Sequence, residues 1–181
     1  QAEIHFQPFE LNPNMPPEGE NTTEHVTKKY GSSPERSAAA RQALKQAGEN
    51  LGFTFNLSPD SGIWNTFDAH RLLHWAGLEG RALQLKEALF KANFTDQRPT
   101  NDPATLLDAV REAGLHLVRA GEILASGEFT DEVRALEAIH EPVVVRELLQ
   151  FLGGGQEAGI IRKLGAAAVE DRDLVRGAPP P

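Results

Sequence analysis

The sequence contains no cysteine, and this absence excludes several kinds of site within its 181 residues. A chain without cysteine forms no disulfide, binds no metal through thiolates and offers no cysteine nucleophile. A lack of structural disulfides is weakly typical of cytoplasmic proteins, whose thiols are kept reduced. We therefore expect a cytoplasmic protein.

Long apolar runs and an excess of basic charge are absent as well. No run reaches the roughly 18 apolar residues of a membrane span, and the first residues lack the basic and apolar regions of a signal peptide. The formal net charge is -8, whereas nucleic acids and anionic membranes bind basic surfaces. We expect neither nucleic acid nor a membrane as the main partner.

The rest of the composition is ordinary for a globular protein, with 40% hydrophobic and 24% charged residues. A chain of this length can form one domain with a sizeable core, or a core with a subdomain. The single methionine is Met15, and the chain starts at Gln1. We therefore expect these residues to be part of a longer protein.

Helical signals fill the interior, from about residue 20 to residue 138. Asn21 and Glu24 have the spacing of a capping box, and Gly31 is a typical helix end. Ser33 followed by Pro34 predicts the start of a second helix, which ends at Gly52. Caps and apolar spacing predict five more helices: one after the cap Asn65, one over 81–94, one from 102 to 114, one over 117–125 and one over 130–138.

Strand signals occur at the two ends of the chain. Residues 3–10 carry apolar side chains until Pro8 interrupts them. Pro142 is followed by three valines, which predicts a short buried strand paired with 148–152 as a hairpin. The glycines at 153–155 predict a strand-to-helix corner, because their spacing fits neither common phosphate-loop motif.

These signals predict an α/β protein in which a large all-helical insertion separates elements of one sheet. The predicted core comprises residues 1–15 and 139–170, and the insertion comprises residues 16–138. The tail over 171–181 ends in three prolines and has little to bury, so we expect it to be loosely held.

Five segments resemble, in order, the FrnE branch of the DsbA-like oxidoreductases. They are Phe6–Pro13, Asn65–Leu73, Leu89–Thr95, Ile123–Phe129 and the hairpin from Pro142 to Gln156. The resemblance implies a thioredoxin-like sheet carrying a helical insertion, and a bacterial enzyme of thiol–disulfide exchange. Its Cys-x-x-Cys pair would begin the first helix, where the helix dipole lowers the thiol pKa.

The chain departs from that family in three places. The first strand and the dithiol helix would lie before Gln1, so we expect them to be missing here. The connector between Thr130 and Pro142 is short, which predicts missing residues beside the active site. Glu141 precedes the proline, and its carboxylate would raise the pKa of a neighbouring thiol by like-charge repulsion.

The resemblance implies that Pro142 follows a cis peptide bond and that the backbone of Glu141 pairs edge-on with a bound peptide or glutathione. It also implies that the loop with Asn12 and Asn14 approaches the bound molecule. The alternative for these asparagines is turn formation, which their side chains favour. Glu141, Pro142 and Asn12 are the predicted substrate-binding residues, and no residue of the chain is predicted to be catalytic.

His70 and His74 are four residues apart on a predicted helix, with Asp68 nearby. This spacing can hold a metal ion on one helical face, but no third ligand follows at a characteristic spacing. We therefore favour a structural pair that hydrogen-bonds the insertion to the sheet. No metal and no cofactor are expected, although glutathione is a candidate substrate or co-substrate.

The leading hypothesis is a DsbA-like thiol–disulfide oxidoreductase that acts on peptide or protein thiols and disulfides, or on glutathione. Without a thiolate the chain as it stands should be redox-inactive. Two alternatives remain open. One is a glutathione-dependent isomerase or transferase, like the related 2-hydroxychromene-2-carboxylate isomerases and kappa-class transferases, which use a serine. The other is a non-catalytic module that binds peptides.

Overall fold

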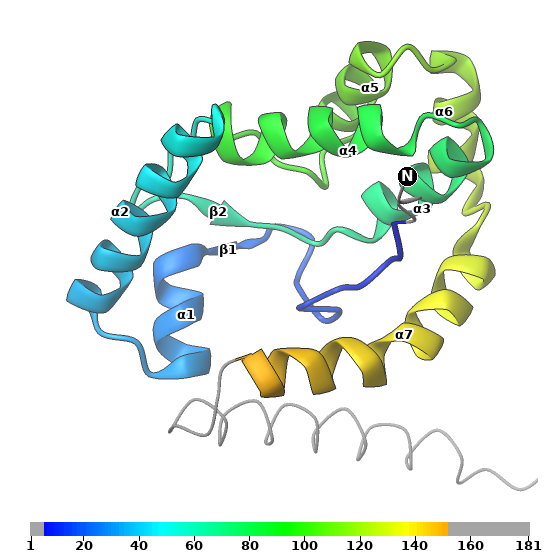
Figure 1. The fold of residues 1–181 in the computed structure, drawn as a ribbon. Coiled ribbons are helices and arrows are strands. Elements are labelled where there is room, and N and C mark those ends of the chain that lie inside the picture. The colour runs from blue at the N-terminus through cyan, green and yellow to red at the C-terminus, as the bar shows by residue number, and fades with distance from the viewer. Residues whose placement is uncertain (1–5, 152–181) are drawn as a thin grey trace, which may run out of the picture. The chain divides into compact units, whose positions relative to one another are not determined.

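The computed structural model describes residues 6–151, and their side chains as far as residue 140. The elements, shown in Figure 1, are β1 (Glu20–Asn21), α1 (Thr22–Tyr30), α2 (Pro34–Leu51), β2 (Gly62–Ile63), α3 (Phe67–Leu78), α4 (Ala82–Phe90), the π-helix η1 (Lys91–Thr95), α5 (Pro103–Glu112), α6 (Leu117–Ser126) and α7 (Thr130–Phe151). The chain divides into two compact units, Gln1–Glu137 and Ala138–Pro181. A membrane-crossing helix is not found between residues 6 and 151.

The caps that the sequence predicts for the first two helices are confirmed. The side chain of Asn21 accepts a hydrogen bond of 3.0 Å from the backbone N–H of Glu24. Ser33 caps α2 in the same way, at 3.3 Å from the backbone nitrogen of Arg36. Each cap satisfies one N–H group that the first helical turn leaves without a partner.

The hydrophobic core of the first unit lies among α3, α4, α5 and α6. Its fully buried side chains include Leu72, Leu85, Leu106 and Ile123. Arg71 is also buried, at 3% exposure, and donates hydrogen bonds to the backbone carbonyls of Glu128 and Ile123 and to the Asp68 carboxylate. These bonds satisfy the buried guanidinium and join α3 to the end of α6.

The helix predicted over 81–94 changes type before it ends. α4 stops at Phe90 and continues as η1, in which the N–H of Asp96 bonds the carbonyl of Lys91 at 2.9 Å. Asn56 donates to the carbonyls of Phe94 (2.9 Å, from its backbone) and Thr95 (2.7 Å, from its side chain). Asn56 therefore supplies hydrogen-bond donors to two carbonyl groups at the end of η1, where the π-helix leaves them without a partner in the helix.

The prediction of a strand at 143–145 is wrong, because α7 extends to Phe151. The prediction of its hairpin partner at 148–152 is wrong for the same reason over its described part, residues 148–151. Pro142 lies inside α7, and the described residues contain no cis peptide bond. The cis bond predicted before Pro142 is therefore not found. The following Arg-Glu-Leu-Leu-Gln segment consists of strong helix formers, and their local preference prevails over the valines. The glycines at 153–155 lie outside the described residues.

A small antiparallel pair interrupts the predicted all-helical interior. β1 pairs with β2, with Glu20 opposite Ile63 and Asn21 opposite Gly62. The strand predicted over 3–10 is not found in its described part, residues 6–10. The sheet between residues 6 and 151 therefore consists of two short strands that join the two ends of the α1–α2 segment.

Substitution of Gly19 by alanine should lower the free energy of unfolding by about 2–3 kcal/mol. Gly19 has φ +72°, and an added Cβ would lie 2.6 Å from the Ile63 carbonyl oxygen and 2.7 Å from Cζ3 of the Trp64 ring. Gly52 is the matched control, because its φ is +74° and an added Cβ would meet no atom within 4 Å. Urea unfolding should show a clearly larger loss for Gly19→Ala than for Gly52→Ala; equal losses would contradict the role of the Trp64 contact.

Candidate functional site

An ion pair anchors the described N-terminal segment to α7. The Glu10 side chain is 2% exposed and pairs with Arg134, whose side chain is 46% exposed. The guanidinium of Arg134 also lies 3.7 Å from the centre of the Phe67 ring and pairs with Glu137 at 2.8 Å. A single arginine thus contacts the segment before β1, the first residue of α3 and its own helix.

The charges at this anchor are only partly balanced. Burial raises the pKa of Glu10, and the hydrogen bond and charge of Arg134 oppose that rise. One carboxylate oxygen, Oε1, of Glu10 and of Glu137 is buried and finds no hydrogen-bond partner in the described part of the chain. The carboxylates therefore depend strongly on Arg134, since it is the cation that bonds both of them.

His70 and His74 make different contacts. Burial and the nearby positive charge of Lys86 lower the pKa of His70 to about 4, and a hydrogen bond with the backbone of Phe9 acts in the opposite direction. The His74 ring packs against Phe129, with 5.2 Å between ring centres. Between residues 6 and 140, no three His, Asp or Glu side chains form a group that could hold a metal ion.

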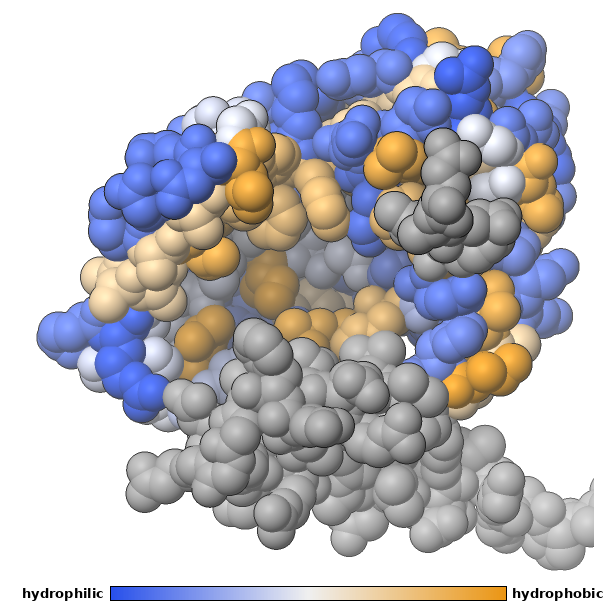
Figure 2. Space-filling view, viewed as in Figure 1, coloured by the Kyte–Doolittle hydropathy of each residue, from blue (hydrophilic) through white to orange (hydrophobic). Residues whose placement is uncertain are grey.

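Four phenylalanines form a continuous line of ring contacts along α4, η1 and the segment after α2. The ring centres are 5.7 Å apart from Phe90 to Phe94, 5.4 Å from Phe94 to Phe55 and 4.8 Å from Phe55 to Phe53. Phe90 is 44% exposed. In Figure 2, hydrophobic side chains gather below α4 and beside α2.

Lys86 extends the line to Phe6. Its ammonium nitrogen lies 4.9 Å from the Phe90 ring centre and 5.9 Å from that of Phe6, which is 37% exposed. Burial lowers the pKa of Lys86, and no carboxylate pairs with it in the described part of the chain. We call the five rings with this ammonium the aromatic strip. Such a surface can bind an apolar chain that carries one acidic group.

The predicted binding residue Asn12 has a structural contact in this protein. Its Oδ1 accepts a hydrogen bond from the Lys29 ammonium and lies 3.1 Å from Nε2 of His25. The other ring nitrogen of His25 lies 2.5 Å from the Glu20 carboxylate. These bonds fix the loop before β1 against α1, so the Asn12 side chain contacts another element and does not close a turn within its own loop.

The three predicted binding residues belong to two different units of the chain. Asn12 belongs to the first unit, whereas Glu141 and Pro142 belong to the second unit and lie in α7. An edge-on pairing with a peptide requires an extended backbone. The helical backbone at Glu141 and Pro142 does not provide it.

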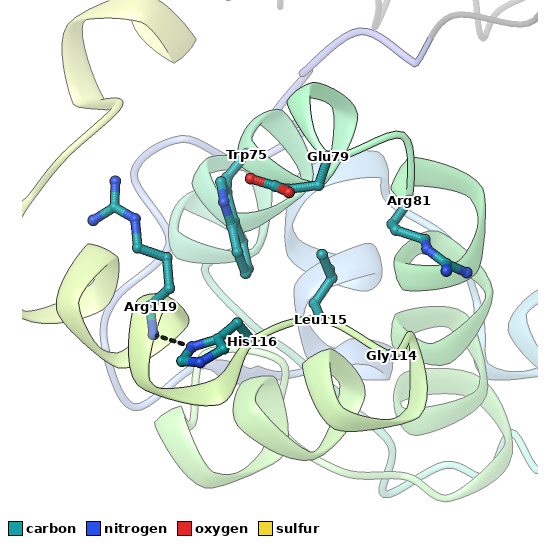
Figure 3. A pocket seen from close by; sticks show the side chains of 7 residues that line it. All are labelled: Trp75, Glu79, Arg81, Gly114, Leu115, His116 and Arg119. Atoms are coloured by element: carbon teal, nitrogen blue, oxygen red, sulfur yellow. Dashed lines mark hydrogen bonds between the residues drawn. The ribbon is translucent and has the colours of Figure 1, made fainter.

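The sequence reasoning missed a pocket between the α3–α4 turn and the α5–α6 turn, shown in Figure 3. Its volume is about 460 Å³, and it is lined by Trp75, Glu79, Arg81, Gly114, Leu115, His116 and Arg119. The local signal was weak, because these residues come from two segments that lie more than thirty positions apart. His116 could have been recognised as a helix cap, but not as a pocket residue.

Comparison with known proteins gives two findings. The family model of the DSBA-like thioredoxin domain matches residues 1–145. The crystal structure of a probable DsbA oxidoreductase from Streptomyces coelicolor is similar to this chain, with 33% sequence identity and a TM-score of 0.69. The similarity covers 75% of this chain and 58% of that one, so the chain spans little more than half of that protein. No curated protein matches the chain.

Proposed function

We propose that the intact protein is a thiol–disulfide oxidoreductase, because this chain belongs to the DSBA-like thioredoxin domain family. The single observation that carries the proposal is the family match over residues 1–145. The similarity to a DsbA oxidoreductase of known structure supports it. The chain has the DsbA-like thioredoxin fold with a helical insertion. We assign the helices from α1 to α6 to that insertion.

The chemistry requires a dithiol that these 181 residues do not contain. We place it in a Cys-x-x-Cys pair upstream, as in the FrnE branch. In the oxidising direction, a substrate thiolate attacks the enzyme disulfide and forms a mixed disulfide, while one enzyme thiolate leaves. A second substrate thiolate then displaces the other enzyme sulfur. The substrate becomes a disulfide, and its two electrons remain on the enzyme dithiol.

The aromatic strip is the part of this chain that we assign to substrate binding. Its half-exposed rings suit the apolar side chains of an unfolded peptide or protein, and Lys86 suits an acidic residue beside them. Glutathione, which carries carboxylates but little apolar surface, fits the strip less well. We leave Glu141 and Pro142 out of the proposal because both lie in α7.

A refolding assay on two proteins tests the function. The 181-residue chain should not accelerate disulfide formation in a reduced substrate protein, because it has no cysteine. The longer natural protein should accelerate it, and replacing the first cysteine of its Cys-x-x-Cys pair by serine should abolish the effect. A natural protein without cysteines upstream of Gln1 would refute the proposal.

The absence of cysteine favours a second candidate, a non-catalytic module that binds peptides. This module would retain the aromatic strip and bind unfolded peptides without turnover. The same pair of proteins separates the candidates: peptide binding by both, with no oxidation by either, would favour the module. A serine in place of the dithiol, with glutathione-dependent activity, would favour an isomerase or transferase.

A further inference from the structure

The aromatic strip presents its groups in a fixed order, and all of them belong to the first unit of the chain. That order is Phe6, Lys86, Phe90, Phe94, Phe55 and Phe53. The ammonium group therefore has one ring on one side and four rings on the other. A chain bound along the strip would meet a positive charge near one end and apolar rings beyond it.

Hydrogen bonds keep the far end of the strip beside η1 before any peptide binds. Oγ1 of Thr95 donates a hydrogen bond of 2.6 Å to the Thr54 carbonyl. The backbone N–H of Asn56 donates one of 2.9 Å to the Phe94 carbonyl. Segment 53–55 is thus joined to the π-helix, and π-helical turns are frequent at functional sites. The line of rings is therefore a feature of the free protein.

The positive charge on the strip is not compensated within residues 6–140. Burial lowers the pKa of Lys86, and no carboxylate there raises it. Asp96, which follows η1, already pairs with Lys91 at 3.6 Å. A carboxylate on a bound chain would therefore find an ammonium group without an acidic partner, beside rings that exclude part of the water.

The spacing of the rings suits an extended peptide. Such a peptide places every second side chain on the same face, at intervals of about 6.6–6.8 Å. Neighbouring ring centres along the strip are 4.8–5.7 Å apart. Each side chain on the bound face would thus reach one ring or the gap between two rings, and a segment of about five residues would extend from Lys86 over the rings beyond it.

We propose that the aromatic strip selects extended peptides in which an acidic residue and two apolar residues occupy every second position, with the acidic residue at one end. The acidic side chain would pair with Lys86, and the apolar side chains would lie on the rings from Phe90 onward. Lys86 then determines the sequence preference of the site. This inference rests on the proposed function, because it takes the bound chain to be the substrate of the oxidoreductase.

Calorimetric titration of the 181-residue chain with blocked peptides tests the proposal. The first peptide is Gly-Glu-Ser-Leu-Ser-Leu-Gly, and two others carry glutamine or lysine in place of the glutamate. The glutamate peptide should bind about fivefold more tightly than the glutamine peptide, and the lysine peptide should bind least tightly. A peptide of the same composition with adjacent leucines should also bind less tightly than the first, because neighbouring side chains point to opposite faces.

Variants of the chain test the role of Lys86 itself. Lys86→Met retains an unbranched apolar side chain without the charge, so it should bind the glutamate and glutamine peptides equally. Lys86→Glu should reverse the preference and favour the lysine peptide. Lys91 is the matched control, because its ammonium group already pairs with Asp96 and Glu112. Lys91→Met should retain the fivefold preference for glutamate over glutamine.

Three results would overturn the proposal. One is equal binding of the glutamate and glutamine peptides by the unchanged chain, and another is an equal loss of preference in Lys86→Met and Lys91→Met. The third is a dimer in analytical ultracentrifugation that Phe90→Ser dissociates, because a second copy of the chain would then occupy the strip.

The peptide titration and the refolding assay fail independently, because binding involves no thiol. Refolding activity of the longer protein without a peptide preference would reject this inference alone. A peptide preference in a protein whose natural form has no cysteines would reject the oxidoreductase and leave the selectivity of the strip intact.

Discussion

Replacement of Arg134 by alanine should lower the free energy of unfolding by about 2–3 kcal/mol. The change removes the cation that bonds the buried carboxylate of Glu10, and it removes the contact with the Phe67 ring. Loss of one partner of a fully buried pair commonly costs about 3–5 kcal/mol, and the lower value applies here because Arg134 is 46% exposed. Urea unfolding at pH 7 measures the loss.

Two other variants separate the charge of this pair from its packing. Glu10→Gln retains the shape and a hydrogen-bond acceptor without the buried charge, so its loss should stay below about 1 kcal/mol. Arg134→Lys keeps the charge but loses the planar contact with Phe67, and its loss should lie between those of the other two. If Arg134→Ala and Glu10→Gln unfold at the same urea concentration, the pair does not anchor the N-terminal segment as described.

Acid should destabilise this protein between pH 6.5 and about pH 4, and His70 should cause much of the loss. The pKa of His70 is lowered from 6.5 to about 4 in the folded protein. The unfolded chain therefore binds a proton first as the pH falls, and unfolding becomes more favourable. The contribution of neutral His70 is complete above pH 6.5 and declines down to about pH 4, by roughly 3 kcal/mol in total.

Protonation of Glu10 changes the stability of the fold in the opposite direction, over the pH range in which Glu10 itself titrates. Because its pKa is raised in the folded state, its protonation stabilises the fold as the pH falls through the raised value, and this stabilisation is lost again as the pH rises. Glu10 thus offsets part of the His70 effect at the acidic end. The combined loss from His70 and Glu10 between pH 6.5 and 4 should therefore be smaller than His70 alone would cause.

The variant His70→Gln should flatten the pH dependence, because glutamine does not titrate. The matched control is His74→Gln on the same helix, where the ring packs against Phe129. Urea unfolding at pH 7.0, 5.5 and 4.5 should give a steep decline for the unchanged chain and for His74→Gln, and a shallow one for His70→Gln. An unchanged slope in His70→Gln would assign the acid sensitivity to other groups.

The helices could be predicted because their signals are local. Asn21, Ser33 and Asp102 each cap a helix through their own side chain, and the glycines after α1 and α2 have the left-handed backbone that ends a helix. The cap predicted for α3 lies one residue too early in the sequence. Asn65 accepts a hydrogen bond from the backbone of Phe67, but the N-cap position belongs to Thr66.

The remaining features depend on contacts that local patterns do not contain. Glu10 and Arg134 are 124 positions apart, so nothing near either residue indicates the pair. The π-helix depends on Asn56, which lies far from η1 in the sequence. The valines after Pro142 predicted a strand, but β propensity is expressed only where a neighbouring strand is available, and α7 occupies these positions instead.

The α1–α2 pair buries no large apolar side chain, because α1 has no buried residue and α2 buries only Ser37 and Gly48. Elements with so little buried apolar area open locally at a small fraction of the global unfolding free energy. The aromatic strip therefore has its middle on the firm α3–α6 core, at Phe90, and one end beside the compliant α2, at Phe53 and Phe55. Such a surface can hold one part of a bound peptide at a fixed position near Phe90. The rings of Phe53 and Phe55 can then move to fit side chains of different size in the neighbouring part of the peptide.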